Sequence, residues 1–276
     1  MAAVKKAVKE VDVYKMEIKL ISQDKKAGKL TFLLKGSSPA FANMLRRTII
    51  NEVPTMAMED IEFRQNSSVL YDELVAHRLG LIPLKTDLKS YNLPEDCKCE
   101  GEGCSRCQLK LILKEKTGGT VYSEDISSLD PKVVPVEGKI PIVKLGKNQS
   151  LEFEATAILG KGKEHAKWSP GLVFYKYAPA IELTKDVKEH NLIVESCPKS
   201  VFELKNKKAV VNPKRLNECH LCGACVDVDA GVKLNEKSDE FIFTIESWGQ
   251  LTPKEMLDEA MNIFKNKLDV FIKAIK

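Results

Sequence analysis

Hydrophobic and polar residues alternate in two short segments near the start of the chain. The first segment begins at Tyr14 and runs to residue 20, and the second covers residues 30–34, with a polar stretch at 22–29 between them. Strict alternation is typical of a β-strand that buries one face. Two such segments joined by a polar turn predict a β-hairpin.

A helical pattern follows this hairpin. Ser38 suits the N-cap, and Pro39 suits the first helical position because the missing N–H of proline costs nothing there. Pro54 is expected to end the helix. The positions that recur on one helical face are Phe41, Met44, Leu45, Thr48 and Ile49.

The other end of the chain repeats this order of strand and helix. Phe241, Phe243 and Ile245 alternate with other residues and predict a strand. Thr252 and Glu255 match a capping box at the start of a long helix. The hydrophobic positions of that helix are Leu257, Ala260, Met261, Phe264, Leu268, Phe271, Ile272 and Ile275.

The hydrophobic stripe of the last helix has two interpretations. A stripe at helical spacing is usually part of the protein's own core. This stripe is long, rich in Phe and Met, and more extensive than one small sheet would cover. We therefore predict that the two terminal helices pair with a partner protein through Phe41, Met44, Leu45, Ile49, Leu257, Met261, Phe264, Leu268 and Phe271.

The middle of the chain shows mainly strand patterns. Short hydrophobic runs separated by Gly and Pro occur around residues 58–63, 109–113 and 151–155, and a short helix is expected at 71–79. His165 could be considered as a catalytic base. No nucleophile or carboxylate partner is marked near it in the sequence, so we interpret it as a loop histidine.

Eight cysteines form two sets of four, and the second set comprises Cys197, Cys219, Cys222 and Cys225. A cysteine followed by proline, together with three cysteines at two-residue intervals, is typical of an iron–sulfur site. Disulfides or a zinc site are the alternatives for these residues. We predict one 4Fe-4S cluster, or a 3Fe-4S cluster if one ligand is lost.

A second cluster is not expected. In the bacterial C-x2-C-x2-C-x3-C pattern the fourth cysteine serves another cluster, and that position is Asp229 here. Hydrophobic residues on both sides of a turn at 205–208 predict a small hairpin between the ligands. The segment resembles half of a bacterial ferredoxin domain.

The first cysteine set comprises Cys97, Cys99, Cys104 and Cys107 in a glycine-rich stretch. Four thiolate ligands leave no open position for water, so the natural candidate for the bound ion is zinc in a closed structural site. The alternative is a loop of ordinary reduced cysteines, because C-x-C spacing is less typical of zinc sites than C-x2-C.

Composition limits the remaining possibilities. The chain has 276 residues, of which 43% are hydrophobic and 30% charged, so a globular protein of two or three domains is expected. A net charge of +4 does not demand a polyanion as the direct ligand. We see no signal-peptide pattern and no membrane span, and we expect a cytoplasmic protein in a reducing compartment.

Four separated motifs, at residues 38–47, 72–84, 164–170 and 246–249, closely resemble the large alpha-like subunit of archaeal DNA-directed RNA polymerase. This subunit is called D and is related to bacterial alpha and to the third-largest eukaryotic subunit. The motifs occur in the same order, and the resemblance covers nearly the whole chain.

The resemblance implies an α+β fold with three parts. A discontinuous alpha-like dimerisation domain would comprise residues 1–51 and 238–276. A mostly β insert domain would comprise residues 52–189 and carry the zinc-type loop at 97–107. A small ferredoxin-like iron–sulfur domain would comprise residues 190–237.

The resemblance also implies partners. The dimerisation domain would pair with the smaller alpha-like subunit L, bind the small subunits N and P, and recruit the two largest subunits, with DNA contacted only indirectly or weakly. The polymerase is a nucleotidyltransferase, but the chain contains no D-x-D-x-D triad for its metal ions. A non-catalytic assembly platform is therefore expected.

Other functions remain open at this point. The cysteine patterns alone would suit an electron-transfer protein or a redox-sensing subunit. A lone cluster conducts electrons poorly, and no G-x-G-x-x-G loop for a flavin is present, so a structural cluster is preferred. A zinc-dependent nucleic-acid binder is weakened by the small net charge and by sparse aromatic and basic clustering.

Overall fold

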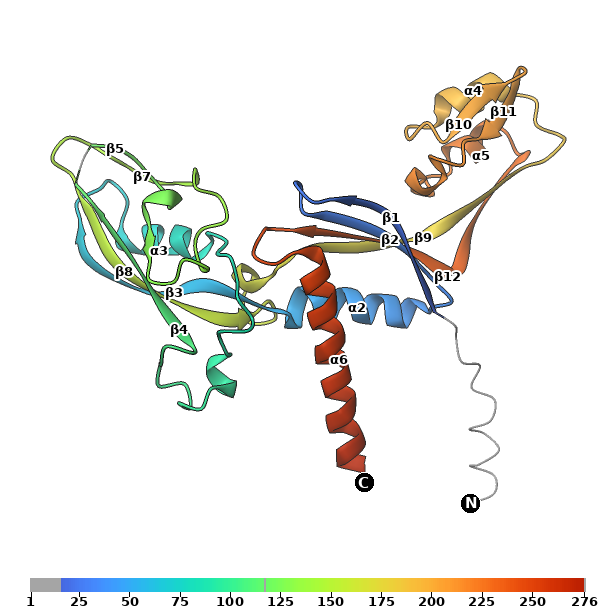
Figure 1. Cartoon of the computed structure of the whole chain (residues 1–276). Helices are drawn as coiled ribbons and strands as arrows, with labels where there is room; N and C mark the ends of the chain where they lie inside the picture. Colours follow the sequence, from blue (N-terminus) through green and yellow to red (C-terminus); the bar gives the residue numbers. More distant parts are fainter. Residues whose placement is uncertain (1–15, 117, 276) are drawn as a thin grey trace. The chain divides into compact units, whose positions relative to one another are not determined.

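The computed structural model describes residues 16–116 and 118–275 (Figure 1). Tyr14, the predicted start of the first strand, lies outside the described residues. Contacts divide the chain into two compact units. Among the described residues, the first comprises 16–23, 31–43 and 174–244, and the second comprises 24–30, 44–116, 118–173 and 245–275. The described residues form a mixed α+β structure.

The terminal segments contribute to one four-stranded sheet in the order β1-β2-β12-β9. Its strands are β1 (Glu17–Asp24), β2 (Lys29–Lys35), β12 (Val232–Ser247) and β9 (Gly171–Leu183). The predicted N-terminal hairpin is confirmed by β1 and β2. Phe32 of β2 stacks on Phe243 of β12, with ring centroids 5.3 Å apart. In β12 all five residues from Phe241 to Ile245 are buried, so this strand is covered on both faces instead of one.

Both predicted terminal helices are present. Helix α2 (Pro39–Glu52) begins as expected, and the backbone N–H of Phe41 donates to Ser38 Oγ at 3.3 Å. Helix α6 (Pro253–Ile275) begins with the predicted capping box. The N–H of Thr252 donates to Glu255 Oε2 at 2.8 Å, and the N–H of Glu255 donates to Thr252 Oγ1 at 3.3 Å.

The second unit contains a sheet in the order β3-β8-β4-β6 and a separate pair, β5-β7. Helix α3 packs on β3, and Val75 and Leu79 of α3 join a core with Phe153 and Leu111. The predicted short helix is therefore confirmed. The bounds are β3 (Pro54–Asn66), α3 (Asp72–Gly80), β4 (Gln108–Glu115), β5 (Gly119–Tyr122), β6 (Ser127–Ser128), β7 (Pro141–Leu145) and β8 (Leu151–Lys161).

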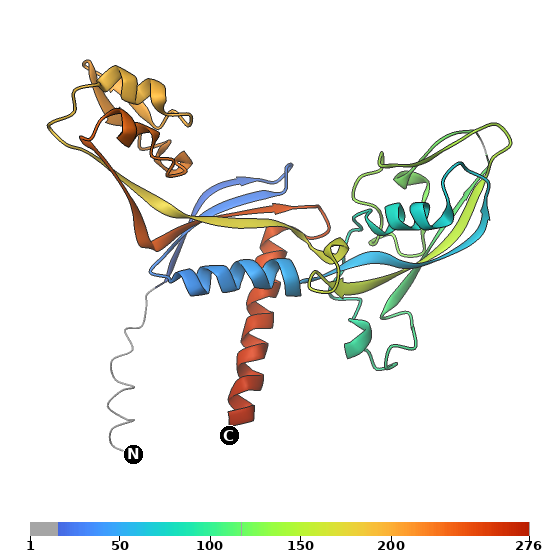
Figure 2. The same ribbon diagram turned by 180° about the vertical axis from the view of Figure 1, so that it is seen from behind.

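The segment between β9 and β12, which is yellow-orange to orange in Figure 2, has its own small hydrophobic core. It contains α4 (His190–Ser196), β10 (Phe202–Lys205), β11 (Lys208–Val211) and α5 (Ala224–Val228). The predicted hairpin is confirmed because β10 pairs antiparallel with β11. Its two turn residues, Asn206 and Lys207, both have positive φ, which matches the twist of a tight hairpin.

Four short 3-10 helices complete the described structure: η2 (Pro94–Asp96), η3 (Ser123–Asp125), η4 (Ala166–Trp168) and η5 (Leu216–Glu218). In the part of the chain that the structure describes, no helix has the length and apolar character needed to cross a membrane.

Candidate metal centres and partner surface

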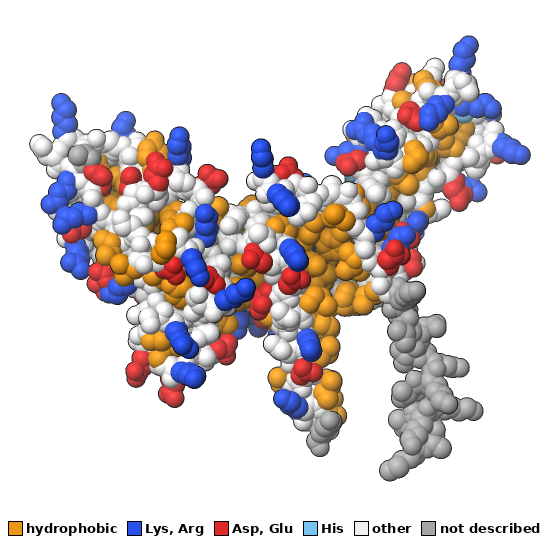
Figure 3. Space-filling view, viewed as in Figure 1, with side chains coloured by type: hydrophobic (Ala, Val, Ile, Leu, Met, Phe, Trp, Pro, Cys, Tyr) orange, Lys and Arg blue, Asp and Glu red, His pale blue; other side chains and the backbone are white. Residues whose placement is uncertain are grey.

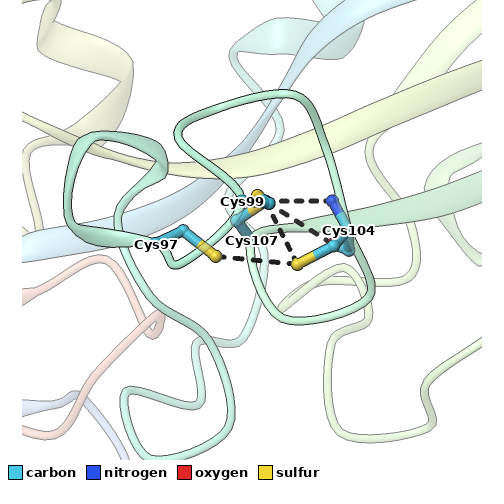
Figure 4. Close-up of side chains that lie close together, drawn as sticks. All are labelled: Cys97, Cys99, Cys104 and Cys107. Atoms are coloured by element: carbon cyan, nitrogen blue, oxygen red, sulfur yellow. Dashed lines mark hydrogen bonds between the residues drawn. The ribbon is translucent and has the colours of Figure 1, made fainter.

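The first cysteine set lies in the loop between η2 and β4, and its four side chains point toward one another (Figure 4). All four sulfur atoms lie within 4.8 Å of one another. The Sγ atoms of Cys97 and Cys104 are 3.6 Å apart, and those of Cys99 and Cys107 are 3.5 Å apart. A tetrahedral zinc ion with bonds of about 2.3 Å requires sulfurs about 3.8 Å apart. The arrangement therefore fits a single zinc-sized ion.

The loop backbone explains how an unusual spacing can form this site. Glu100, Gly101 and Gly103 all have positive φ, which turns the chain back between Cys99 and Cys104. A Cβ atom on Gly103 would lie 2.5 Å from Oε1 of Gln108, so a larger residue would displace that side chain. The glycines thus allow C-x-C-x4-C-x2-C to bring four sulfurs together.

The thiols of this loop differ in their acidity. Hydrogen bonds from the Cys97 thiol and from the N–H of Gly103 lower the pKa of Cys99, because they stabilise its thiolate. Burial raises the pKa of Cys107 above its usual value. A bound dication would favour the thiolate at all four positions, so this donor set suits a soft divalent ion.

The second cysteine set comes from three separated segments. Cys197 follows α4, Cys219 follows η5, and Cys225 lies in α5. Together with Cys222, these residues line one pocket. Four thiolates around one pocket are a donor set that suits an iron–sulfur cluster.

Backbone N–H groups point at two of these sulfurs. The N–H of Val201 donates to Cys197 Sγ at 3.3 Å, and the N–H of Leu221 donates to Cys219 Sγ at 3.5 Å. Such donors stabilise thiolates and are common around iron–sulfur clusters. None of the eight cysteines, all of which are described, forms a disulfide. The disulfide alternative is therefore wrong for this structure.

Lys176 of β9 holds the loop that carries Cys219. Its Nζ donates to the backbone oxygens of Asn217 and Cys219 at 2.6 and 2.8 Å. Burial lowers the pKa of Lys176. The periodicity of β9 contained no signal for this role, because the two oxygens lie more than 40 positions further along the chain.

Asp229 occupies the position at which the two-cluster pattern has its fourth cysteine. Its carboxylate accepts hydrogen bonds from the N–H groups of Lys188, Glu189 and Gly231 at 2.7, 3.0 and 2.8 Å. These bonds hold the pKa of Asp229 below its usual value. Asp229 therefore links the segment that enters this small core, at residues 188–189, to the segment that leaves it, at residue 231. The sequence did not reveal this role.

The predicted partner residues fall into three groups. Leu45 and Ile49 are buried inside the chain, so the prediction that they contact a partner is corrected to a core role. Phe41, Met44, Leu257 and Phe264 are half-buried. Met261, Leu268 and Phe271 are exposed, and hydrophobic side chains gather along one side of α6 (Figure 3).

His165 acts as a helix cap. Its Nδ1 accepts the N–H of Lys167 at 3.1 Å, and its ring meets the ring of Trp168 edge to face at 6.5 Å. These contacts agree with the interpretation of His165 as a loop residue.

Comparisons with known proteins identify the class of this chain. Residues 55–171 match the family described as RNA polymerase Rpb3/RpoA insert domain. This range contains β4, β8, the first cysteine loop and all of β3 except its first residue. The chain is therefore in the class of RNA polymerase subunits that carry such an insert.

Curated relatives identify the family within that class. The chain is 38% identical over 261 residues to DNA-directed RNA polymerase subunit Rpo3 of Methanosphaera stadtmanae, a match that covers 91% of this chain and 96% of the relative. It is 38% identical to Rpo3 of Archaeoglobus fulgidus, with 94% and 98% coverage, and 36% identical to Rpo3 of Pyrococcus furiosus, with 92% and 95% coverage. This chain belongs to the Rpo3 family of DNA-directed RNA polymerase subunits and functions in transcription as a non-catalytic subunit.

Proposed function

We propose that this chain is the assembly platform of an RNA polymerase, and that it pairs with the smaller alpha-like subunit L before it binds N, P and the two largest subunits. The observation that supports this proposal most directly is the exposed hydrophobic stripe of α6. Met261, Leu268, Phe271, Ile272 and Ile275 of this stripe are all exposed. A hydrophobic surface of this extent on a soluble helix marks a site of protein association.

The role of α2 in this pairing is narrower than the sequence predicted. Since Leu45 and Ile49 are buried, only the half-buried Phe41 and Met44 remain for the partner among the predicted residues of α2. We therefore assign most of the interface to the C-terminal half of α6, and pairing would resemble two amphipathic helices packed face to face.

The pairing is tested by co-expression with subunit L and co-purification. Leu268→Asp places a charge in the stripe and is expected to reduce recovery of L by about 30-fold or more, because a buried unpaired charge costs at least 2 kcal/mol at an interface. Asn262→Asp adds the same charge at an exposed position of α6 outside the stripe and should leave recovery unchanged. Equal recovery of L with both variants would contradict the proposed interface.

We further propose a structural zinc ion at Cys97, Cys99, Cys104 and Cys107, and one iron–sulfur cluster at Cys197, Cys219, Cys222 and Cys225. The short sulfur distances support the first assignment. The pocket that the four cysteines share, and the backbone N–H groups that donate to Cys197 and Cys219, support the second. The cluster would be 4Fe-4S, or 3Fe-4S without the exposed Cys222.

A structural role for the cluster is supported by the size of the surrounding core. Only eight buried residues form this core, and two of them are the predicted ligands Cys219 and Cys225. A core of this size rarely supports an independent fold without a metal or a disulfide. Membership of a transcription family also disfavours the alternative of an electron-transfer protein. We therefore propose three domains at the predicted boundaries 1–51 with 238–276, 52–189 and 190–237, the last of which depends on its cluster.

A further inference from the structure

The hairpin of β10 and β11, between Cys197 and Cys219, carries a concentration of positive charge. Residues 199–215 contain six basic side chains and one acidic side chain, Glu203, whereas the whole chain has a net charge of only +4. All six basic residues are exposed, and blue Lys and Arg side chains surround this segment in Figure 3. They are Lys199, Lys205, Lys207, Lys208, Lys214 and Arg215.

Three of these lysines meet at the tip of the hairpin. Lys205 and Lys208 are directly opposite partners in the pairing of β10 with β11. Opposite residues have Cβ atoms about 5 Å apart, and like charges in such positions destabilise a sheet. Lys207 adds a third cation in the two-residue turn that joins the strands. The tip therefore retains an electrostatic repulsion that neutral residues would remove.

Lys207 also has an unfavourable backbone conformation. Its φ is 61°, and that of Asn206 is 51°. Two-residue hairpin turns in which both φ angles are positive favour Asn at the first position and Gly at the second, because the side chain of most other residues is strained there. A lysine in place of the favoured glycine thus costs stability. Costs of this kind are typical of positions where the side chain serves a function.

Most of the basic residues of this hairpin are not neutralised inside the chain. Lys205 Nζ lies 2.8 Å from Glu203 Oε1. Among the residues that the structure describes, the other five form no ion pair. The lysines of β4 differ in this respect, since Lys110 pairs with Glu154 and Lys114 pairs with Glu152 on the neighbouring strand. The charge of the hairpin therefore remains available to an external anion.

The side chains around this charge favour one class of anion. In residues 190–237 the only Phe, Tyr or Trp is Phe202, which is 3% exposed. Proteins that bind single-stranded nucleic acids stack bases on exposed aromatic rings, and the cores of protein interfaces are also rich in aromatic side chains. The phosphate backbone of a duplex requires only cations and polar donors. A duplex therefore suits this surface better than a single strand or a protein.

The basic residues lie at both ends of the hairpin. The N–H of Asn212 donates to the oxygen of Val201 at 2.8 Å, so Lys199 and Lys214 belong to the segments at the end opposite the turn. Each strand has four residues, which corresponds to a length of about 13 Å. Duplex DNA carries one negative charge per about 1.7 Å of its axis. A surface of this length faces several phosphates at once.

We propose that the hairpin of β10 and β11 contacts the phosphate backbone of duplex DNA and does not read its sequence. The contact is weak and depends on salt, because each phosphate neutralised by Lys or Arg releases a counterion. This inference goes beyond the platform function, since it gives the chain a direct contact with DNA that does not require pairing with L. The bound phosphates also relieve the repulsion between Lys205 and Lys208.

The first test measures the affinity of the full chain for a fluorescent DNA duplex of about 30 base pairs, by anisotropy at salt concentrations from about 50 to 200 mM. The triple variant Lys205→Gln, Lys207→Gly and Lys208→Gln should bind at least tenfold more weakly at the lowest salt. Its plot of log affinity against log salt should be shallower by about 2–3, since each phosphate contact contributes about 0.9 to the slope.

The matched control removes three charges from exposed positions of the second unit. It combines Lys139→Gln, Lys144→Gln and Lys147→Gln, and it should retain both the affinity and the slope of the original chain. Equal affinities and slopes in the two triple variants would overturn the proposal, because the effect would then depend on total charge and not on the hairpin.

Lys207→Gly alone separates the charge from the fold. Glycine suits the turn, so thermal stability and iron content should be equal or higher, while the affinity for the duplex falls about threefold or more. An unchanged affinity would contradict the proposal. So would a weaker affinity together with lower stability, because the loss would then come from an unfolded hairpin.

Two further measurements distinguish DNA from an acidic protein. If the hairpin variant loses binding to poly-glutamate but keeps its binding to the duplex, the surface serves an acidic polypeptide and the proposal is overturned. In the intact polymerase on duplex DNA, a photo-crosslinking amino acid at position 208 should crosslink to DNA, with Lys205 and Lys207 left in place. Crosslinks to protein alone, or none, would overturn the proposal. Failure of the platform function would appear separately, as unchanged recovery of L with Leu268→Asp.

Discussion

The two cysteine regions bring four cysteine side chains to one site in different ways. In the 97–107 loop, eleven consecutive residues bring four sulfurs within 4.8 Å of one another, and positive φ angles at its glycines provide the turn. In the second region the candidate ligands come from the residue after α4, from the segment after η5 and from α5, and Cys219 and Cys225 are part of the core. The first site is therefore a local structure, whereas the second exists only when its segment is folded.

The largest expected difference between the regions follows from removing one buried ligand in each. Cys225→Ala should abolish iron binding and expose residues 190–237 to protease, because the variant loses both a ligand and part of a small core. Cys107→Ala should lose zinc but keep the sheet β3-β8-β4, whose core is much larger. Metal analysis and limited proteolysis measure both effects.

The same pair of variants serves as reciprocal controls. Cys225→Ala should retain zinc, and Cys107→Ala should retain iron. Cleavage in both variants at the same sites would show that the two regions unfold together and would contradict the distinction between a local and a tertiary site.

A smaller effect is expected from Lys176→Met. This change removes two hydrogen bonds to backbone oxygens near Cys219, and an unsatisfied buried oxygen costs about 1–3 kcal/mol. We expect iron to be lost to a chelator roughly tenfold faster, as followed by visible absorbance, with zinc retained. Lys185→Met is the control, since Lys185 is exposed in the same region. Equal rates of iron loss in the two variants would show that Lys176 does not support the loop.

The smallest effect concerns Asp87, in the segment that leads to the zinc-type loop. Hydrogen bonds from Lys132, Ser90 and the N–H of Lys89 lower its pKa well below the usual value of 3.8. The ionised Asp87 carboxylate therefore stabilises the folded state fully above about pH 4. This stabilisation is lost as the pH falls through the lower pKa that Asp87 has in the folded state. Asp87→Asn should cost roughly 1 kcal/mol at pH 7 and less at pH 2–3, as measured by urea unfolding. A cost that is independent of pH would mean that the charge of Asp87 is unimportant.

Much of the fold could be predicted from the sequence because its signals are local. The capping box at Thr252, the cap at Ser38 and the turn at Asn206 involve residues within a few positions of one another, and each was found as predicted. The two cysteine sets that we propose as metal ligands were recognised for the same reason, since short intervals between most of the cysteines carry the pattern.

Burial was the less predictable property. Leu45 and Ile49 have the same helical spacing as the exposed residues of α6, and periodicity cannot tell a face that meets the chain's own sheet from one that meets another protein. The five buried residues of β12 show the same difficulty, because alternation predicts one covered face and not a second.

The sequence by itself determined most of the elements, their caps, the two sets of candidate ligand cysteines and, through its similarity to Rpo3 subunits, the family. Tertiary structure decided which hydrophobic residues stay exposed and that the Asp229 carboxylate accepts three backbone N–H groups of the small core. The physical reason is the separation along the sequence between the residues that interact. Hydrogen-bonded turns and caps depend on neighbours in sequence, whereas burial and unsatisfied polar groups depend on what packs from elsewhere in the chain.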